Sequence, residues 1–473
     1  MTVQNEFNRD LIDHSVSLAK TAAEFWGVSN TNTRSKLLQG FATSLEQNQD
    51  DLIELANTET GLGAQRLTAE LLRTVYQLRG FATEVESGAP YRQVDDKAVE
   101  GLPPSGRPHL TRVQVPLGPV AMFSASNFPF AFSVLGGDTA SALAAGCPVV
   151  VKAHTGHSEL SRAVYRLAKR VISTHGLPEG VLTLIENTNR NENGYLVQHP
   201  DICAVAFTGS YQGGKALWKL ANERTKPIPF FGELGSLNPL VVLPEALERE
   251  GETLARTLAN SITMGAGQFC TKPGIVVVLD HPLTSRFIDQ LAIEILPLKT
   301  HRMLTPGIRG SFETAVSVVA NRAMTVFQPE ADGLGPAPRL FKVNANQFME
   351  DASLREEMFG PAAVIVTASN MSQVLGVLNA VEGTLTTTIW GAYHATADNE
   401  ALVRTAENIS GRVLFSGVPT GVAICHAQQH GGPWPASTTP QTTSVGYAAI
   451  ERFLRPVALQ DAPAWVVEAR RGD

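Results

Sequence analysis

The chain has 473 residues, which is more than one hydrophobic core usually supports, so we expect two or three domains. Hydrophobic residues make up 43% of the chain and charged residues 18%, as in ordinary globular proteins, which excludes a disordered or fibrous chain. The net charge is -7 and the sequence has no Lys/Arg run, so a nucleic-acid partner is not expected.

The ends and the cysteines of the chain indicate its compartment. Residues Met1–Glu6 lack the positive and apolar regions of a signal peptide, and no stretch offers the roughly 20 apolar residues of a membrane span. We therefore expect a cytoplasmic protein without a membrane partner. Cys147, Cys203, Cys270 and Cys425 are too sparse for a disulfide framework or a CxxC metal site, and buried, reduced thiols are expected at all four. Only the surroundings of Cys270 suggest a reactive thiol.

The first hundred residues are predicted to be helical. Apolar side chains recur at helical spacing over 12–26, 37–45 and 71–78. A polar segment with proline and glycine, residues 87–108, then interrupts the pattern. We interpret this region as scaffold and assign it no chemistry.

From residue 120 onward, short apolar strands alternate with helices. The first series of strands is expected at 120–123, 149–151, 181–185 and 204–207, with intervening helices at 139–145 and 159–172. A second series is expected at 240–243, 275–279, 363–366, 386–390 and 413–415. This alternation predicts an α/β fold, in which parallel sheets are covered by helices on both faces.

Ligands of such sheets bind beyond the carboxyl ends of the strands. The segments that follow the first four strands are 124–127, 152–155, 187–190 and 208–214. In the last of these, Gly209 and Gly214 bound a turn that opens a helix near residues 215–220. Such a turn can approach a pyrophosphate closely, although a purely structural turn explains the pattern equally well.

One thiol and one carboxylate are candidates for catalysis. Gly265 and Gly267 let backbone amides approach Cys270, and such donors lower the pKa of a thiol and make it nucleophilic. Glu233 lies in a glycine-rich turn and can deprotonate the water that releases a thioester from such a cysteine. A structural cysteine and a solvated turn carboxylate are the alternatives.

Asn127 is a candidate oxyanion donor. It follows a strand and precedes Phe128-Pro129, where its amide can act together with the Cys270 backbone N–H. The alternative is an asparagine that caps a turn before proline.

Six motifs resemble those of the aldehyde dehydrogenase superfamily, in the same order and over essentially the whole chain. They are Ser126-Asn127-Phe128-Pro129, Val151-Lys152-Ala153-His154, Phe207-Thr208-Gly209-Ser210, Glu233-Leu234-Gly235, Gly267-Gln268-Phe269-Cys270 and Glu357-Met358-Phe359-Gly360-Pro361.

The resemblance implies two doubly wound α/β domains plus a small β oligomerisation element, in a homodimer or homotetramer. The nicotinamide dinucleotide-binding domain would comprise residues 1–103 and 117–232, and the catalytic domain residues 233–435. The oligomerisation strands would lie in 104–116 and 453–473, joined by a return segment at 436–452. A strand at 455–460 is expected to pair with 111–115 or with another subunit's sheet.

The resemblance also implies the role of each site residue. Cys270 would be the nucleophile, Glu233 the general base and Asn127 an oxyanion donor. Lys152 would bind the adenosine ribose or its phosphate, and Gly209, Ser210 and Gly214 would lie at the pyrophosphate. Glu357 would bind the nicotinamide ribose, with Phe359 and Leu234 close to the nicotinamide end. The base at position 233 favours hydrolysis over transfer to coenzyme A.

The residue three places after Lys152 bears on the choice of cofactor. NAD-using relatives often carry Glu there, whereas this chain has Thr155. A carboxylate would repel a 2′-phosphate by about 4 kcal/mol at a separation of about 4 Å and an effective dielectric constant of about 20, but a hydroxyl can donate to it. Arg190 is a second candidate contact. We therefore expect a preference for NADP, with NAD also possible.

Two further segments, Gly136–Leu143 and His430–Ala436, most resemble the 2,5-dioxovalerate (α-ketoglutarate semialdehyde) dehydrogenase group. This implies oxidation of that semialdehyde to α-ketoglutarate through a cysteine thiohemiacetal and thioester. However, Pro440-Gln441 replaces the basic residue that usually precedes the Thr-Thr-Ser-Val-Gly motif. A broad fatty or aromatic aldehyde dehydrogenase, with Trp434 and Phe130 lining its tunnel or packing in the core, therefore remains an alternative.

Two other expectations concern a protein without catalytic activity and a metal site. A catalytically silent binding or structural protein on the same fold is a distant alternative, against which Cys270 and Glu233 argue together. His154, His157 and His430 lack a convincing metal-ligand spacing with acidic or thiol partners, so no metal is expected.

Overall fold

The computed structural model describes residues 2–330 and 334–468, which divide into two compact units. The first unit runs to Gly232 and also includes residues 424–428 and those from 442 onward. The second unit comprises residues 233–423 and 429–441. The predicted three-part domain organisation stays a prediction, and residues 469–473 of its last strand segment lie outside the described residues.

A buried parallel sheet forms the centre of the first unit. Its strands, in the order β5-β4-β3-β6-β7, are β5 Leu182–Ile185, β4 Val149–Lys152, β3 Val120–Phe123, β6 Ala204–Thr208 and β7 Phe230–Glu233. In the parallel register, Val120 of β3 pairs with Val149 of β4 and with Ala204 of β6. Strands that are covered on both faces must be apolar throughout, which is why these short runs were recognisable in the sequence.

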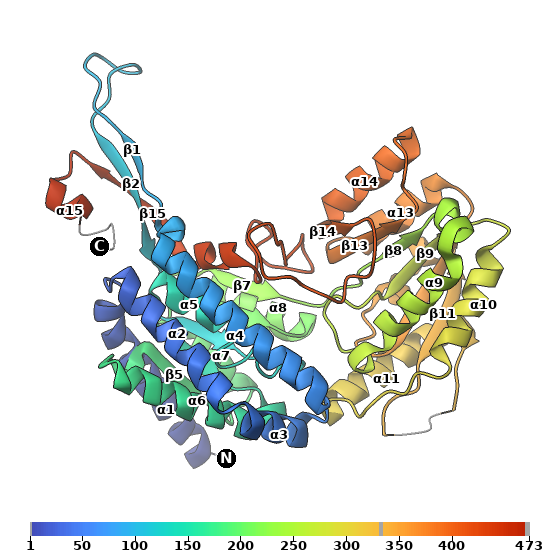
Figure 1. Ribbon diagram of the computed structural model, residues 1–473, viewed down its shortest axis with the longest axis horizontal. Coiled ribbons are helices and arrows are strands. Elements are labelled where there is room, and N and C mark those ends of the chain that lie inside the picture. Colours follow the sequence, from blue (N-terminus) through green and yellow to red (C-terminus); the bar gives the residue numbers. More distant parts are fainter. Residues whose placement is uncertain (1, 331–333, 469–473) are drawn as a thin grey trace. The chain divides into compact units, whose positions relative to one another are not determined.

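Helices cover both faces of this sheet (Figure 1). The face that carries Ala121 and Val205 packs against α1 Thr2–Trp26, α7 Arg190–Gln198 and α8 Tyr211–Asn222. The other face packs against α5 Gly137–Ala145 and α6 Ser158–Thr174, with α2 Thr31–Gln47, α3 Gln49–Thr60 and α4 Ala64–Ser87 outside them. Short 3-10 turns complete the unit: η1 Ala89–Tyr91, η2 Thr155–His157, η3 Glu179–Val181 and η6 Tyr447–Phe453.

A small antiparallel sheet extends from the first unit (Figure 1). Its strands are β1 Val94–Asp96, β2 Leu110–Pro116 and β15 Leu454–Gln460, and the short helix α15 Ala464–Glu468 follows β15. The central strand β2 pairs with both of the others, and Val457 of β15 lies opposite Val113. The predicted pairing of 455–460 with 111–115 is confirmed, and β15 forms one edge of this sheet.

The second unit is built on a seven-stranded sheet in the order β10-β11-β12-β9-β8-β13-β14. The strands are β8 Leu240–Val242, β9 Ile275–Leu279, β10 Met324–Phe327, β11 Arg339–Asn344, β12 Ala362–Ala368, β13 Thr384–Trp390 and β14 Ser410–Leu414. Only β10 is antiparallel to its neighbour, and it occupies an edge.

Helices again cover both faces of the seven-stranded sheet. One face packs against α9 Pro244–Thr263 and α10 Thr284–Ile295. The other packs against α11 Pro306–Ala320, α12 Ala345–Glu350, α13 Met371–Val381 and α14 Ala397–Ile409. The turns η4 Met264–Gly267 and η5 Ala352–Arg355 complete this unit. The predicted α/β fold with parallel sheets is therefore confirmed.

Three local predictions were wrong, because strand pairing and capping side chains decide where elements begin and end. Glu233 does not lie in the predicted glycine-rich turn but ends strand β7, and its burial excludes the alternative of a solvated turn carboxylate. Ser210 caps α8 by accepting from the Gly213 N–H, so this helix begins at Tyr211 and contains Gly214. Asn189 caps α7 in the same way, which makes Arg190 the first residue of a helix and not a loop residue.

The cysteines also depart from the expectation that all four are buried. Cys147 is buried, whereas Cys425 is exposed and Cys203 and Cys270 are half-buried. No helix in the described part of the chain is long and apolar enough to cross a membrane.

Candidate active site

The turn that carries Cys270 follows helix α9 and has an unusual backbone. Gly265, Ala266 and Gly267 have φ values of 58°, 54° and 68°, so three successive residues adopt the left-handed conformation. Glycine is needed at 267, because a Cβ atom there would lie 2.1 Å from the carbonyl carbon of Gly360. This close approach joins the turn of the thiol to the segment that begins at Glu357.

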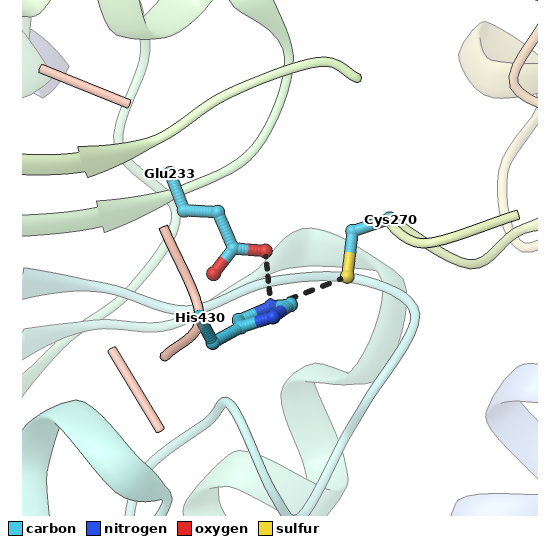
Figure 2. A group of neighbouring side chains, drawn as sticks. All are labelled: Glu233, Cys270 and His430. Atoms are coloured by element: carbon cyan, nitrogen blue, oxygen red, sulfur yellow. Dashed lines mark hydrogen bonds and ion pairs between the residues drawn. The ribbon is translucent and has the colours of Figure 1, made fainter. Parts of the chain in front are cut away.

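Glu233 and His430 converge on the thiol of Cys270 (Figure 2). The Nε2 atom of His430 lies 3.0 Å from Oε1 of Glu233 and 3.7 Å from Sγ of Cys270. Glu233 is 4% exposed and His430 is 2% exposed, so neither can exchange this contact freely for water. The structure therefore brings together the two catalytic residues expected from the sequence and adds a histidine between them.

The position of the imidazole proton follows from the chemistry of its neighbour. An ionised carboxylate can only accept hydrogen bonds, so Nε2 of His430 carries a hydrogen whenever Glu233 is ionised. That N–H also lies beside the sulfur of Cys270. The Nε2–H group of His430 can therefore donate a hydrogen bond to the Glu233 carboxylate or to the Cys270 thiolate, whichever of the two carries the negative charge.

The pKa of Cys270 differs from the expectation. Burial raises the pKa of the thiol well above its usual value, and the negative charge of Glu233 raises it further. The Cys270 backbone N–H has the predicted lowering effect on this pKa, but it is the smaller influence. The prediction of a lowered pKa was wrong, because the sequence pattern of glycines revealed the amide donor but not the adjacent carboxylate.

Asn238 connects the Glu233 segment to the Cys270 turn. Its amide nitrogen donates to the carbonyl of Cys270 at 2.7 Å and to that of Lys272 at 3.0 Å, and its carbonyl oxygen accepts from the Ser236 hydroxyl at 2.8 Å. Asn238 is 1% exposed and has a φ of 49°, which asparagine tolerates better than most residues. The sequence analysis missed this residue, for which the only signal was its position five residues after Glu233.

The buried Lys272 and Glu357 affect each other's pKa through their opposite charges. Lys272 is 3% exposed and donates to the carbonyl of Ala362 at 2.6 Å. Burial raises the pKa of Glu357 to about 7, against the opposing effects of the Lys272 ammonium and of the Ser236 backbone N–H. Burial likewise lowers the pKa of Lys272, which the charge of Glu357 opposes. Glu357 can therefore change its charge near neutral pH.

Helix α4 and His157 hold the segment around Asn127 in the first unit. Arg66 donates to the carbonyl of Asn127 at 2.5 Å, and Glu70 accepts from the N–H groups of Phe130 at 2.8 Å and Ala131 at 3.0 Å. Nε2 of His157 lies 2.9 Å from the carbonyl of Ala125. The prediction that the N-terminal helices are scaffold alone was therefore too limited, since α4 positions a candidate oxyanion donor.

Asn127 itself is 7% exposed. It belongs to the first unit and Cys270 to the second, so their joint action on an oxyanion stays a prediction. Phe130 is 3% exposed, as expected for core packing, whereas Trp434 is 39% exposed.

Polar groups without partners lie at the carboxyl edge of the five-stranded sheet. Lys152 ends β4, is half-buried and has neither a hydrogen bond nor an ion pair from its ammonium to any described residue. Burial lowers its pKa. The hydroxyl of Thr208, which ends β6, is buried without a partner among the described residues, and Gly209 and Ser210 lead from there into α8. Orphaned polar groups at this edge fit a site for a polar ligand.

The other predicted cofactor residues have different surroundings. Thr155 lies exposed in η2, and Arg190 lies exposed at the start of α7. In the second unit, Leu234 is buried and its N–H donates to the carbonyl of Ala436 at 2.8 Å, while Phe359 is half-buried. The roles of all these residues toward a cofactor stay predictions.

Comparison with known proteins identifies the family. Residues 2–432 match the family model described as the aldehyde dehydrogenase family. The chain belongs to the aldehyde dehydrogenase family. Among curated relatives, alpha-ketoglutaric semialdehyde dehydrogenase 2 of Azospirillum brasilense is 41% identical over 96% of this chain and 87% of its own length. Alpha-ketoglutaric semialdehyde dehydrogenase of Acinetobacter baylyi is 38% identical over 96% of this chain and 86% of its own.

Solved structures share the fold. A mutant of Thermus thermophilus 1-pyrroline-5-carboxylate dehydrogenase aligns with a TM-score of 0.80 at 19% identity, over 96% of this chain and 86% of that one. Apo betaine aldehyde dehydrogenase of Staphylococcus aureus aligns with a TM-score of 0.79 at 19% identity, over 96% and 88% of the two chains. The aldehyde dehydrogenase fold expected from the motifs is confirmed.

The chain is thus an aldehyde dehydrogenase, and the alternative of a silent protein on the same fold is not supported. The main omission of the sequence analysis is His430. It lies 160 residues after Cys270, in a motif that was used to recognise a subgroup, and it was otherwise considered only as a metal ligand and rejected. Spacing along the chain could not reveal that this histidine and the thiol are neighbours in space.

Proposed function

We propose that this aldehyde dehydrogenase oxidises α-ketoglutarate semialdehyde to α-ketoglutarate with NADP. The substrate is inferred from the two relatives of that name, which are 41% and 38% identical to this chain. The convergence of Cys270, His430 and Glu233 is the observation that carries the reaction type, because it supplies a nucleophile, a proton donor and a base at one place.

The residues at the edge of the five-stranded sheet fit a dinucleotide. Lys152 offers a cation without a partner among the described residues, and the N-terminus of α8 at Ser210 offers amide donors for phosphate. Thr155 and Arg190 would contact a 2′-phosphate, and Glu357 the nicotinamide ribose. When bound, the nicotinamide supplies the acceptor for the hydride of the substrate.

In the first half of the reaction the thiol must lose its proton. Glu233 takes that proton, and the N–H of His430 then donates to the thiolate that remains. The sulfur attacks the aldehyde carbon, and the Cys270 backbone N–H with the Asn127 amide stabilises the oxyanion of the thiohemiacetal. Departure of the hydride leaves a thioester on Cys270.

In the second half of the reaction Glu233 acts as the base for water. The proton that Glu233 took from the thiol passes to solvent, and the N–H of His430 holds the ionised carboxylate in place at 3.0 Å. Attack of water on the thioester releases the carboxylic acid and restores the thiol. Because the carboxylate is part of the site, hydrolysis is favoured over transfer to coenzyme A.

Arg412 is our candidate for the positive charge that the sequence lacks before Thr442. It lies on β14, half-buried, and interacts electrostatically with Cys270. Its terminal nitrogens donate to the carbonyls of Gly421 at 2.8 Å and Pro419 at 2.7 Å, which are neutral groups, and its Nε is buried without a partner among the described residues. The guanidinium thus has unused donors for a substrate carboxylate.

A kinetic comparison tests the proposed substrate and cofactor. The kcat/KM of the purified enzyme should be highest for α-ketoglutarate semialdehyde, lower for hexanal and benzaldehyde, and higher with NADP than with NAD. Arg412→Gln should lower the value for the semialdehyde about tenfold or more and leave hexanal nearly unchanged, whereas Arg190→Ala should raise the KM for NADP and leave that for NAD unchanged.

Higher kcat/KM for hexanal or benzaldehyde would instead favour the broad-specificity alternative. Equal effects of Arg190→Ala and of the matched control Arg170→Ala, an exposed arginine on α6, would contradict the proposed 2′-phosphate contact.

We also propose that the chain assembles as a homodimer or homotetramer through the small sheet of the first unit. Its strand β15 forms an edge, and edge strands offer backbone donors and acceptors to a second chain.

A further inference from the structure

The three side chains around the thiol offer ligand atoms of three kinds within 4.8 Å of one another, namely a sulfur, an imidazole nitrogen and a carboxylate oxygen. The S···N distance is 3.7 Å and the N···O distance is 3.0 Å. Around a tetrahedral zinc ion, with Zn–S near ~2.3 Å and Zn–N or Zn–O near ~2.1 Å, ligand atoms lie about 3.4 to 3.6 Å apart. Small side-chain movements would bring the present group to that spacing.

From this geometry, we propose that Cys270, His430 and Glu233 form a binding site for a zinc ion, which inhibits the enzyme reversibly. The thiolate and the carboxylate would together balance the charge of Zn²⁺, and the neutral imidazole would complete three protein ligands. The fourth position would hold water. Cys270 is half-buried, whereas the other two ligands are almost fully buried.

The backbone already holds these three ligands together. Glu233 forms an antiparallel bridge with Ser437, and the N–H of Leu234 donates to the carbonyl of Ala436 at 2.8 Å. This pairing fixes the Glu233 segment against the segment that follows His430. Asn238 then fixes the Cys270 carbonyl at 2.7 Å. A metal site with ligands that are held in advance loses less conformational entropy on binding.

Zinc at this position would prevent catalysis, because it would use the lone pairs that the reaction needs. Binding displaces the thiol proton to solvent, moves the imidazole hydrogen of His430 from Nε2 to Nδ1, and forms a bond between sulfur and the metal, so the sulfur can no longer attack an aldehyde. The carboxylate oxygen is no longer available to water. Inhibition should therefore be competitive with the aldehyde and should be reversed by a chelator.

Binding of Co²⁺ and Zn²⁺ to the full-length, metal-free enzyme tests this site without any use of turnover. One Co²⁺ per chain should bind and produce the intense near-ultraviolet absorption of a cobalt–thiolate bond, together with the visible bands of a four-coordinate ion. Zinc should displace the cobalt and should slow alkylation of Cys270 by iodoacetamide.

Variants decide which residues bind the ion. Cys270→Ala should abolish the thiolate absorption, and His430→Asn and Glu233→Gln should each weaken zinc binding at least tenfold, as measured by equilibrium dialysis. Cys425→Ser and His154→Gln serve as matched controls, because they alter an exposed thiol and a histidine of the other unit, and they should bind zinc like the wild type.

Unchanged zinc affinity in Cys270→Ala, cobalt spectra without the thiolate absorption, or no binding at micromolar metal would each overturn the proposal. Activity of the metal-free enzyme in EDTA is expected to be full. That activity tests the proposed reaction separately, so a failure of the zinc site and a failure of the proposed function can be distinguished.

Discussion

At the scale of single residues, the charge on a few buried side chains controls the proposed chemistry. Burial and the neighbouring carboxylate keep the Cys270 thiol protonated in the structure, so its activation requires a local base and a donor. Glu233 and His430 supply these two groups on one side of the sulfur. The dependence of the thiol on His430 can be measured directly.

His430→Gln should lower kcat by about 10²-fold or more, within the range of roughly 10² to 10⁴ that positioned proton-transfer groups contribute. The variant should also react more slowly with iodoacetamide, because the thiolate loses its N–H donor. His426→Gln is the control, since that histidine is exposed and pairs with Glu84. If the alkylation rate of Cys270 were unchanged in His430→Gln, the assigned role would be wrong.

The raised pKa of Glu357 predicts that the KM for NADP depends on pH. Its pKa is raised to about 7, so it is mostly protonated at pH 6 and mostly ionised at pH 8. An ionised carboxylate accepts ribose hydroxyls through both oxygens, whereas the protonated form loses part of this capacity. The KM for NADP should therefore rise as the pH falls from 8 to 6, by up to about tenfold for the last unit below the pKa.

Glu357→Gln removes the titrating group. Its KM for NADP should be high and nearly independent of pH over the same range. A variant that kept the wild-type slope of KM against pH would show that another group is responsible.

At the scale of elements, strand ends and helix caps place the functional residues. Most strands that are buried on both faces were predicted to within three residues, since their apolar runs are continuous: 120–123 is β3, and 275–279 is β9. The buried strand β7 and strand β11 were missed. The start of α8 was predicted less well and α7 was not predicted, because a single capping side chain decides where each of them begins. The edge strand β10, which alternates little and is partly exposed, carried no usable signal.

Only those residues of the candidate site that belong to recognisable sequence motifs could be predicted. Cys270, Glu233 and Asn127 each stood in a recognisable segment, but their contacts are made across long separations in the sequence. Asn238 and Glu70 hold the site through backbone hydrogen bonds, and nothing in a single sequence distinguishes such residues from solvated ones. Their burial is a property of the fold and not of the local pattern.

Glu70 provides a test at this scale. Its carboxyl group accepts two backbone N–H groups from the segment after Asn127, and it is 4% exposed. Glu70→Ala leaves both buried donors without this acceptor, so the free energy of unfolding should fall by about 1 to 3 kcal/mol and kcat should decrease. Glu70→Gln retains an acceptor oxygen and should stay closer to the wild type in urea denaturation and in activity. Equal stability of Glu70→Ala and the wild type would contradict this role.

At the scale of the whole molecule, we propose that the first unit binds the cofactor and that the second carries the catalytic side chains. The first offers orphaned polar groups at the carboxyl edge of its sheet, where we propose that a dinucleotide binds, and the second holds the thiol, the histidine and the carboxylate together. The chain boundary between the two units lies at Glu233 itself. The proposed base therefore stands where the two units join along the chain.

The central claim is that Glu233 releases the product from a thioester on Cys270, and pre-steady-state kinetics of Glu233→Gln test it most directly. After rapid mixing with aldehyde and NADP, followed by acid quenching, NADPH and the mass of the Cys270 peptide are measured together. Because Glu233 also takes the thiol proton, we predict that NADPH forms slowly to about one per site, with no further turnover and an acyl group on Cys270. Steady turnover at the wild-type rate, with an unmodified Cys270 peptide, would contradict the account.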